Sequence, residues 1–300
     1  MSTQAKERAH NMQISQTING FCITLLADGY SPITVKVYRQ RLHRLSAFLR
    51  DKHIDTITPD DMRSFYVELH KTVSSSSVQA YWKTMRSFFR WAETEFQCKR
   101  PDADIPAPRF QHSVVVPFTH DEVAKMLRAA KTKRDKTILL LLLDTGLRVS
   151  EACRLNVADV DLETGTVQVR PWQSSAKSRP RVVYIGKAAR KAIWYYLSSR
   201  PDVDANAPLI STNVGHPLDR YQVAKILTRI ATRAGVSKTH PHRFRHTFAI
   251  EFLRNGGNIF ELQRLLGHAS LQMVRMYLDL SDSDTAEAHK RASPADNWRL

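Results

Sequence analysis

The residue types that could carry out chemistry on a phosphodiester gather in the second half of the chain. His242, Arg245, His268 and Tyr277 lie in one short stretch, and Arg148 stands upstream in the segment DTGLRVSE. Two guanidinium groups can hold a phosphodiester, because each is permanently charged and matches two oxygens with a planar fork. Imidazole can move protons near neutral pH, and a phenolic oxygen can attack phosphorus. This set of residues predicts DNA strand cleavage.

A tyrosine nucleophile has two chemical needs. A free phenol side chain has a pKa of ~10, so attack on an anionic phosphodiester needs charge neutralisation and a nearby proton acceptor. Arg148 and Arg245 could bind the phosphate and stabilise the extra charge of the transition state. Either His242 or His268 could accept the proton of Tyr277.

Departure of the sugar 5′-oxygen needs a proton donor, because an alkoxide leaves poorly unless a proton arrives as the bond breaks. The polar stretch RPWQSSAKSRP contains one lysine, Lys177, which we expect to be this general acid. DNA would then be held as a 3′-phosphotyrosyl ester beside a free 5′-hydroxyl. The ester conserves the bond energy, so we expect religation to need neither ATP nor a metal ion.

Each of these residues also has an ordinary structural explanation. Tyr277 alone could be a half-buried core aromatic with its hydroxyl at the surface. Arg148 could form an ion pair with Glu151 at a helix start, and His268 could be a satisfied interior histidine. We expect His246 to be an interior histidine of that kind.

The charge of the chain favours a polyanionic partner. Its 300 residues include 45 Lys and Arg against 29 Asp and Glu, a formal net charge of +16. Such an excess favours nucleic acid over an acidic membrane face. The apolar share of 42% is enough for proper cores.

Cysteines and apolar runs indicate a cytoplasmic protein. Cys22, Cys98 and Cys153 are widely spaced and form no CxxC pair, so they predict neither a disulfide framework nor a thiolate zinc site. The longest apolar run, 138–143, is far shorter than the ~20 residues that cross a bilayer. Residues 1–12 are polar and lack a hydrophobic signal region.

A proline-rich segment divides the chain. No helix should run through residues 100 to 117, because proline lacks an N–H and clashes within a helix. The prolines of this segment are Pro101, Pro106, Pro108 and Pro117. We therefore expect a helical DNA-binding domain over 1–105, a linker over 106–117 and a catalytic domain over 118–300 with a C-terminal tail from about residue 282.

Helix-start signals recur before the linker. Ser31 precedes Pro32 and Thr58 precedes Pro59, each pairing an N-cap residue with a proline suited to the first turn, and Ser74 begins a further helix entry. A compact domain of four or five helices is expected. Its helices carry basic residues, some of which could face DNA phosphates. They are Lys36, Arg39, Arg41, Arg44, Arg50, Lys83, Arg86 and Arg90.

The catalytic half is expected to be mostly helical. Thr119 and Glu122 match the capping-box spacing, and the leucine-rich helix that follows should end near Gly146. Arg148 then opens another helix, VSEACRL. Two β-branched runs, 166–169 and 181–185, predict a hairpin with a long basic turn. The remainder should be helical. The fold class is thus mainly α with a small antiparallel β-sheet in the catalytic domain.

Three motifs in order resemble those of the tyrosine recombinases, also called phage integrases. They are DTGLRVSE, PHRFRHTFA, and LLGH followed by a tyrosine nine residues after its histidine. The resemblance covers nearly the whole chain. Position by position it implies Arg148 and Arg245 as phosphate-clamping arginines, His242 and His268 as the two histidines, and Tyr277 as the nucleophile.

The resemblance also implies partners and a course of reaction. The family acts without metal or nucleotide cofactor on double-stranded DNA recombination sites. It exchanges strands through a four-way junction within a tetramer. The tail from about residue 282 resembles those that dock on a neighbouring subunit. A cytoplasmic, nucleoid-associated protein is implied, acting in integration, excision or resolution.

The hairpin turn departs from the family pattern. The family sequence often reads GKGxKxR, whereas this chain has RPWQSSAKSRPR, which is longer and lacks glycine. Lys177 is the one lysine in it and is therefore assigned as the catalytic lysine.

Two other functions fit part of the pattern. A type IB topoisomerase uses a similar tyrosine and phosphate clamp to relax supercoils without strand exchange. A zinc-stabilised DNA-binding module is suggested by His240, His242 and His246, with His268 downstream. Arginines lie among these histidines and would repel a dication, and no Cys, Asp or Glu joins them.

Overall fold

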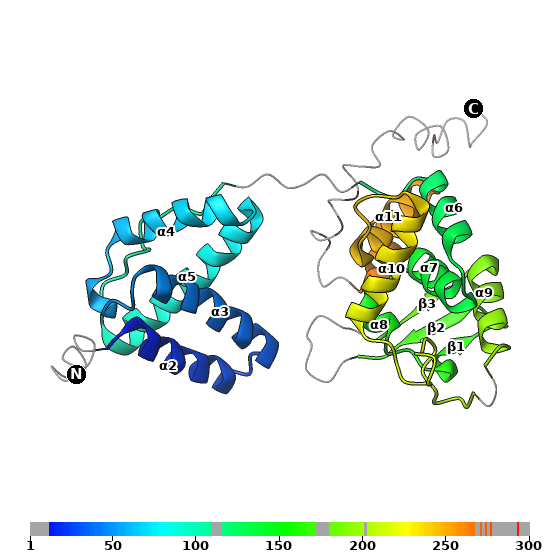
Figure 1. Cartoon of the computed structure of the whole chain (residues 1–300), viewed down its shortest axis with the longest axis horizontal. Helices are drawn as coiled ribbons and strands as arrows, with labels where there is room; N and C mark the ends of the chain where they lie inside the picture. The colour runs from blue at the N-terminus through cyan, green and yellow to red at the C-terminus, as the bar shows by residue number, and fades with distance from the viewer. Residues whose placement is uncertain are drawn as a thin grey trace. The chain divides into compact units, whose positions relative to one another are not determined.

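The computed structural model describes residues 12–109, 116–171, 180–200 and 203–267, together with Leu271, Val274, Tyr277 and Ser293 (Figure 1). The chain forms two compact units, Met1–Val114 and Val115–Leu300. The middle of the expected linker, 110–115, lies outside the described residues.

The first unit is a helical domain whose helices begin at the expected caps. Ser31, Thr58 and Ser74 each accept a hydrogen bond from a backbone N–H in the first turn of the helix that follows. The helices are α2 (Ile14–Ala27), α3 (Pro32–Phe48), α4 (Pro59–Thr72) and α5 (Ser75–Phe96), with a short 3-10 turn η1 (Ile54–Thr56).

A single apolar core holds this unit together. Its large aromatic members, Phe65, Phe88 and Phe89, are fully buried, and Phe21 packs edge-on against Phe88. Polar contacts join the helices as well: Arg41 on α3 donates to the carbonyl of Ala80 and to Thr84 on α5. Five of the eight basic residues expected to face DNA are exposed. These are Lys36, Arg39, Arg50, Lys83 and Arg90.

The second unit surrounds a small sheet with helices (Figure 1). Strands β1 (Val160–Asp161), β2 (Thr166–Val169) and β3 (Arg181–Tyr184) form an antiparallel sheet in the order β1-β2-β3. Its helices are α6 (His120–Ala129), α7 (Lys133–Thr145), α8 (Val149–Ala152), α9 (Lys187–Leu197), α10 (Arg220–Ala234), α11 (Pro241–Arg254) and α12 (Ile259–Leu266), with a 3-10 turn η2 (Val157–Asp159). The mainly helical fold with a small antiparallel sheet is confirmed.

Two expectations for this unit, the helix VSEACRL and a wholly helical remainder, were wrong in part. Helix α8 ends at Ala152 instead of continuing to Leu155, because the N–H groups of Arg154 and Leu155 bond three residues back in tight turns, and the carbonyl of Leu155 accepts from the N–H of Leu209. The backbone of 203–219 is not helical, and isolated bridges join Asn156 to Pro208 and Ser211 to Pro217. Such long-range pairing leaves no periodic pattern in the local sequence.

Gly146 ends helix α7 in the left-handed conformation, with φ +60°. A residue with a Cβ is disfavoured at this φ, and the surroundings leave no room for one. An added Cβ would lie 2.9 Å from Cγ of Phe248 and closer still to its Cδ1. The turn at Gly146 leads from α7 to Arg148. The conformation of this turn therefore determines the position of the Arg148 backbone.

Replacing Gly146 with alanine should destabilise the protein by about 2–5 kcal/mol, the sum of a left-handed backbone cost and overpacking against Phe248. Denaturant unfolding measures this change. Gly215→Ala is the matched control, because Gly215 has φ +85° but nothing within 4 Å of an added Cβ. It should cost only the backbone part, about 1–2 kcal/mol. Equal losses in the two variants would contradict the packing argument.

Candidate active site

Arg148 stands at the start of α8 and is fixed there by Glu151. The backbone N–H of Arg148 donates to Oε2 of Glu151 at 2.9 Å, and its guanidinium lies 3.2 Å from Oε1. The ion pair that could by itself have explained Arg148 is therefore present. This ion pair is compatible with a phosphate-binding role, because the Glu151 carboxylate holds the guanidinium in one position.

Arg245 lies on α11 and is buried, with 4% of its surface exposed. Its guanidinium donates to the carbonyl of Gly146 at 2.8 Å and to the carbonyl of Leu266 at 2.7 Å. Burial, and secondly the positive charge of Arg148, lower the pKa of Arg245 to about 10. The group is still protonated at neutral pH. Two cationic side chains that are far apart in the sequence thus lie within one electrostatic environment.

Glu151 and Arg181 support this cationic pair. The Glu151 carboxylate, 1% exposed, also binds Arg181 on β3 at 2.9 Å. Arg181 donates to the carbonyl of Leu265, next to the carbonyl that Arg245 binds. Burial by itself would raise the pKa of Glu151, but the hydrogen bond and charge of Arg181 and the contacts from Arg148 outweigh it, and the pKa is lowered overall. Sequence reasoning missed Arg181, because a basic residue at a strand start carries no signal of its own.

Glu151→Gln should lower the free energy of unfolding by about 3–5 kcal/mol at pH 7, because it leaves buried guanidinium charge without its partner. The folded pKa of Glu151 is depressed. Its contribution is therefore fully present above the unfolded value of 4.5 and is lost as the pH falls through the folded pKa.

Unfolding curves of wild type and Glu151→Gln should accordingly converge as the pH drops below about 4.5. Glu251→Gln serves as control, since Glu251 and Arg254 form an exposed pair whose loss should cost at most about 1 kcal/mol. A wild-type advantage that is constant from pH 7 to pH 3 would show that the carboxylate charge does not carry the effect.

His242 is the exposed member of the group, in the first turn of α11. Partial desolvation, and secondly the charge of Arg245, lower the pKa of His242 below its ordinary value. The imidazole is therefore neutral at pH 7 and has a nitrogen available to accept a proton.

Tyr277 is 2% exposed and packs in a small cluster with residues of α11 and α12. Its hydroxyl lies 2.8 Å from Nδ1 of His246. Burial raises the pKa of Tyr277, while the charges of Arg245 and Arg148 oppose this rise. The hydroxyl is thus within the field of both arginines. The expectation that His246 is an ordinary interior histidine was incomplete: the ring is half-buried, and the group it contacts is the hydroxyl of Tyr277.

Arg148, His242, Arg245 and Tyr277 are therefore brought together in one part of the second unit. Lys177 and His268 lie outside the described residues, as does the tail expected from about residue 282, apart from Ser293. Among the described residues, no three His, Cys, Asp or Glu side chains gather in a way that could hold a metal ion. No helix in the described part of the chain is long and apolar enough to cross a membrane.

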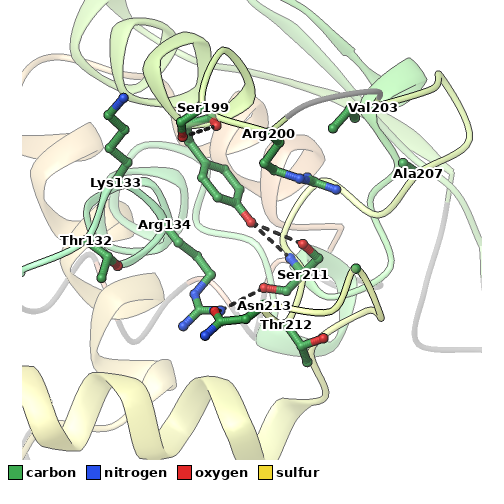
Figure 2. Close-up of a pocket in the computed structure, with 12 residues that line it drawn as sticks. Thr132, Lys133, Arg134, Ser199, Arg200, Val203, Ala207, Ser211, Thr212 and Asn213 are labelled. Carbon is green, nitrogen blue, oxygen red and sulfur yellow. Dashed lines mark hydrogen bonds between the residues drawn. The ribbon is translucent and has the colours of Figure 1, made fainter.

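A separate pocket of about 590 Å³ opens at the other end of α7 (Figure 2). Its two arginines are used within the protein: Arg134 donates to the carbonyl of Ser211 and to Asn213, and Arg200 donates to the carbonyls of Pro208 and Leu209. None of the residues predicted to do chemistry lines it. We therefore take the arginine-rich site at the end of α7 near Gly146 as the candidate active site.

Comparison with known proteins extends over both units. Residues 117–284 match the phage integrase family, and residues 18–95 match the N-terminal SAM-like domain of phage integrases. The chain is 32% identical over 293 residues to the tyrosine recombinase XerC of Alcanivorax borkumensis, covering 93% of this chain and 94% of that protein.

Solved structures share the fold. The Tn1549 transposon integrase in complex with transposon right end DNA superposes with a TM-score of 0.77 at 20% identity, covering 94% of this chain and 100% of that one. A lambda integrase tetramer bound to a Holliday junction gives a TM-score of 0.74 at 18% identity, covering 87% of this chain and 79% of that one. At such identities the likeness concerns the fold alone.

Proposed function

The chain belongs to the phage integrase family, and from this premise we propose that Arg148, His242, Arg245 and Tyr277 form the DNA-cleaving centre of a site-specific tyrosine recombinase. One observation carries the proposal. The hydroxyl of Tyr277 lies within the field of two arginines that are themselves held by buried carbonyl and carboxylate groups. A phenol in an apolar core needs no such neighbours.

The two arginines act as a preorganised clamp for the scissile phosphate. Arg245 is fixed by two backbone carbonyls, and Arg148 is fixed by Glu151. Fixed guanidinium groups need little reorganisation when charge develops on the phosphoryl oxygens, which is the condition for strong transition-state stabilisation. The burial of Arg245 strengthens this effect, because the charge acts in a less polar medium.

The attack forms a bond between the Tyr277 oxygen and phosphorus and breaks the bond from phosphorus to the sugar 5′-oxygen. The phenol proton passes to a neutral base, for which His242 has the right protonation state. The 5′-oxygen takes a proton from the Lys177 ammonium, and His268 completes the site as its second histidine. The product is a 3′-phosphotyrosyl ester with a free 5′-hydroxyl, and the reverse steps rejoin the strand.

The nucleophile is shielded in the structure without DNA. With only 2% of Tyr277 exposed, a phosphodiester can reach its hydroxyl only after the surrounding side chains shift. We therefore expect DNA binding to move the side chains that cover Tyr277 before cleavage. Cleavage in the absence of a correctly bound site is suppressed by the same burial.

Double-stranded DNA at a recombination site is the substrate. The exposed basic side chains of the first unit, such as Lys36, Arg39 and Lys83, contribute phosphate contacts. Strand exchange takes place within a tetramer of this chain on four-way DNA, as the fold likeness to a junction-bound lambda integrase tetramer suggests. The protein works on nucleoid DNA in the cytoplasm.

The C-terminal tail from about residue 282 links the subunits of this tetramer by docking on a neighbour. The second unit has an apolar groove of about 900 Å³ beside the start of α6, lined by Phe118, Val123, Leu143, Phe248 and Phe252 among others. The tail contains Pro294 and Trp298, which could fill such a groove. The pyrrolidine ring of Pro294 and the indole ring of Trp298 would bury apolar surface at little conformational cost.

Covalent capture tests the proposed function. A DNA library carrying nicks, from which the short fragment with the free 5′-hydroxyl diffuses away after cleavage, is incubated with the protein in a strong chelator. We expect DNA joined to protein through its 3′-end, and sequencing of this DNA to return one preferred site. Absence of any adduct, or adducts spread evenly over all sequences, would contradict the assignment as a site-specific recombinase.

A further inference from the structure

The hydroxyl of Tyr277 has a direct partner that the proposed mechanism leaves unused. Nδ1 of His246 lies 2.8 Å from the Tyr277 oxygen, and the two ring centroids are 5.6 Å apart. His246 stands next to Arg245 in the sequence of α11, so one helix carries both an arginine of the phosphate clamp and the contact to the nucleophile.

The protonation states of the two groups allow Tyr277 to be the donor of this hydrogen bond. Desolvation, and secondly repulsion from the protonated form of His242, lower the pKa of His246 to about 4. The other charged groups that act on His246 are His240 and Arg245, and both act in the same direction. The pKa of Tyr277 is raised, so the phenol keeps its proton. A neutral imidazole accepts at one nitrogen, and when that nitrogen is Nδ1 the phenol is its donor.

We propose that His246 is the positioning residue of the tyrosine nucleophile: its Nδ1 accepts the Tyr277 hydroxyl hydrogen and so orients the phenolic oxygen toward the clamped phosphate. This inference rests on the proposed function of Tyr277. With the hydrogen directed at His246, both lone pairs of the oxygen face away from the imidazole and are available to phosphorus. Orientation of a nucleophile before attack lowers the barrier, because the alignment need not be found during the reaction.

Among the described residues, Tyr277 is the partner that the structure gives to Nδ1 of His246. The ring is half-buried, and its neighbour His242 lies 6.5 Å away between ring centroids. The positioning role requires the tautomer that carries the ring proton on Nε2.

Two substitutions separate positioning from packing. His246→Ala removes the acceptor, whereas His246→Asn keeps an acceptor oxygen near the place of Nδ1. Single-turnover adduct formation is measured on saturating suicide DNA, and DNA affinity is measured separately. We expect His246→Ala to slow adduct formation about 100-fold, the loss expected when a reacting group is misplaced, with affinity unchanged. His246→Asn should recover most of the rate, and His216→Ala, which removes an exposed histidine of the same unit, should match wild type.

Nitrogen NMR gives a second measurement, and its main readout, the tautomer of His246 in the wild-type protein, does not depend on folding of a variant. We expect Nδ1 of His246 to be unprotonated at pH 7, and its signal to shift in Tyr277→Phe. A proton on Nδ1, or adduct formation by His246→Ala at or above the wild-type rate, would overturn the inference. If Tyr277→Phe itself forms the adduct, the proposed function is wrong instead, so the two failures are distinguishable.

Discussion

Tyr277→Phe will abolish the covalent protein–DNA adduct while leaving DNA affinity nearly unchanged. The substitution removes one oxygen, and that oxygen is the atom expected to form the bond to phosphorus. The aromatic ring stays in its apolar cluster with Val274 and Leu266. Loss of a hydroxyl that pairs with His246 should cost about 1 kcal/mol of stability. Denaturing gel electrophoresis of reactions on suicide DNA measures the adduct, and a binding isotherm measures affinity.

Tyr196→Phe is the matched control for this substitution. Tyr196 is also a buried tyrosine of the second unit whose hydroxyl is hydrogen-bonded, in its case with Ser211. It lies in the separate pocket at the far end of α7. We expect wild-type adduct formation from Tyr196→Phe. An adduct from Tyr277→Phe would mean that another residue is the nucleophile.

Arg245→Lys should slow adduct formation by about 10²–10³-fold, the loss expected when one preorganised donor to a developing oxyanion is removed. The charge is kept, but lysine has no planar fork with which to bind carbonyls and phosphate together. Arg245 donates N–H groups to the carbonyls of Gly146 and Leu266, and a single ammonium cannot reproduce that geometry. Quench-flow or manual sampling of adduct on saturating DNA gives the rate.

Arg254→Lys on the same helix controls for the loss of an arginine as such. Its side chain is 43% exposed and pairs with Glu251 at the surface. This variant should cleave like wild type. Thermal unfolding of both variants is needed beside the kinetics, because Arg245 also joins α11 to the turn that ends α7. A rate for Arg245→Lys within a few-fold of wild type would contradict the clamp.

Local features of the fold could be predicted from the sequence, because their causes are local. Thr119 with Glu122 forms the expected capping box, and Gly146 ends α7 as a left-handed residue. The hairpin strands follow from β-branched alternation, with Val167 paired to Val183 at 0% exposure for both. Strand β1 was not predicted, because two residues are too few for any periodicity.

The candidate site could be predicted only in part, because its support comes from long-range contacts. Arg148 and Arg245 were identified by motif and by the chemistry of guanidinium. Glu151 entered only as an ion-pair partner of Arg148, and Arg181 did not enter at all. His246 was assigned to the interior because nothing in its neighbourhood along the chain reveals Tyr277 as its partner. The assignments of Lys177 and His268 remain predictions.

Burial of Tyr277 and the charge of Arg245 act in opposite directions on the pKa of the phenol. The apolar cluster raises the pKa of the phenol and keeps it protonated at rest, while the arginines favour its ionised form. Binding of a phosphodiester between the arginines would bring phosphorus to the oxygen at the moment when the phenol can lose its proton. We therefore expect the site to react only when DNA is bound.

The most direct test is to identify the residue that carries DNA. Wild-type protein is trapped on suicide DNA, digested with protease and nuclease, and its peptides are sequenced by mass spectrometry. The proposed mechanism predicts a nucleotide 3′-phosphate esterified to Tyr277 in the peptide that follows Arg275. A nucleotide on any other side chain, or one attached through a 5′-phosphate, would contradict it.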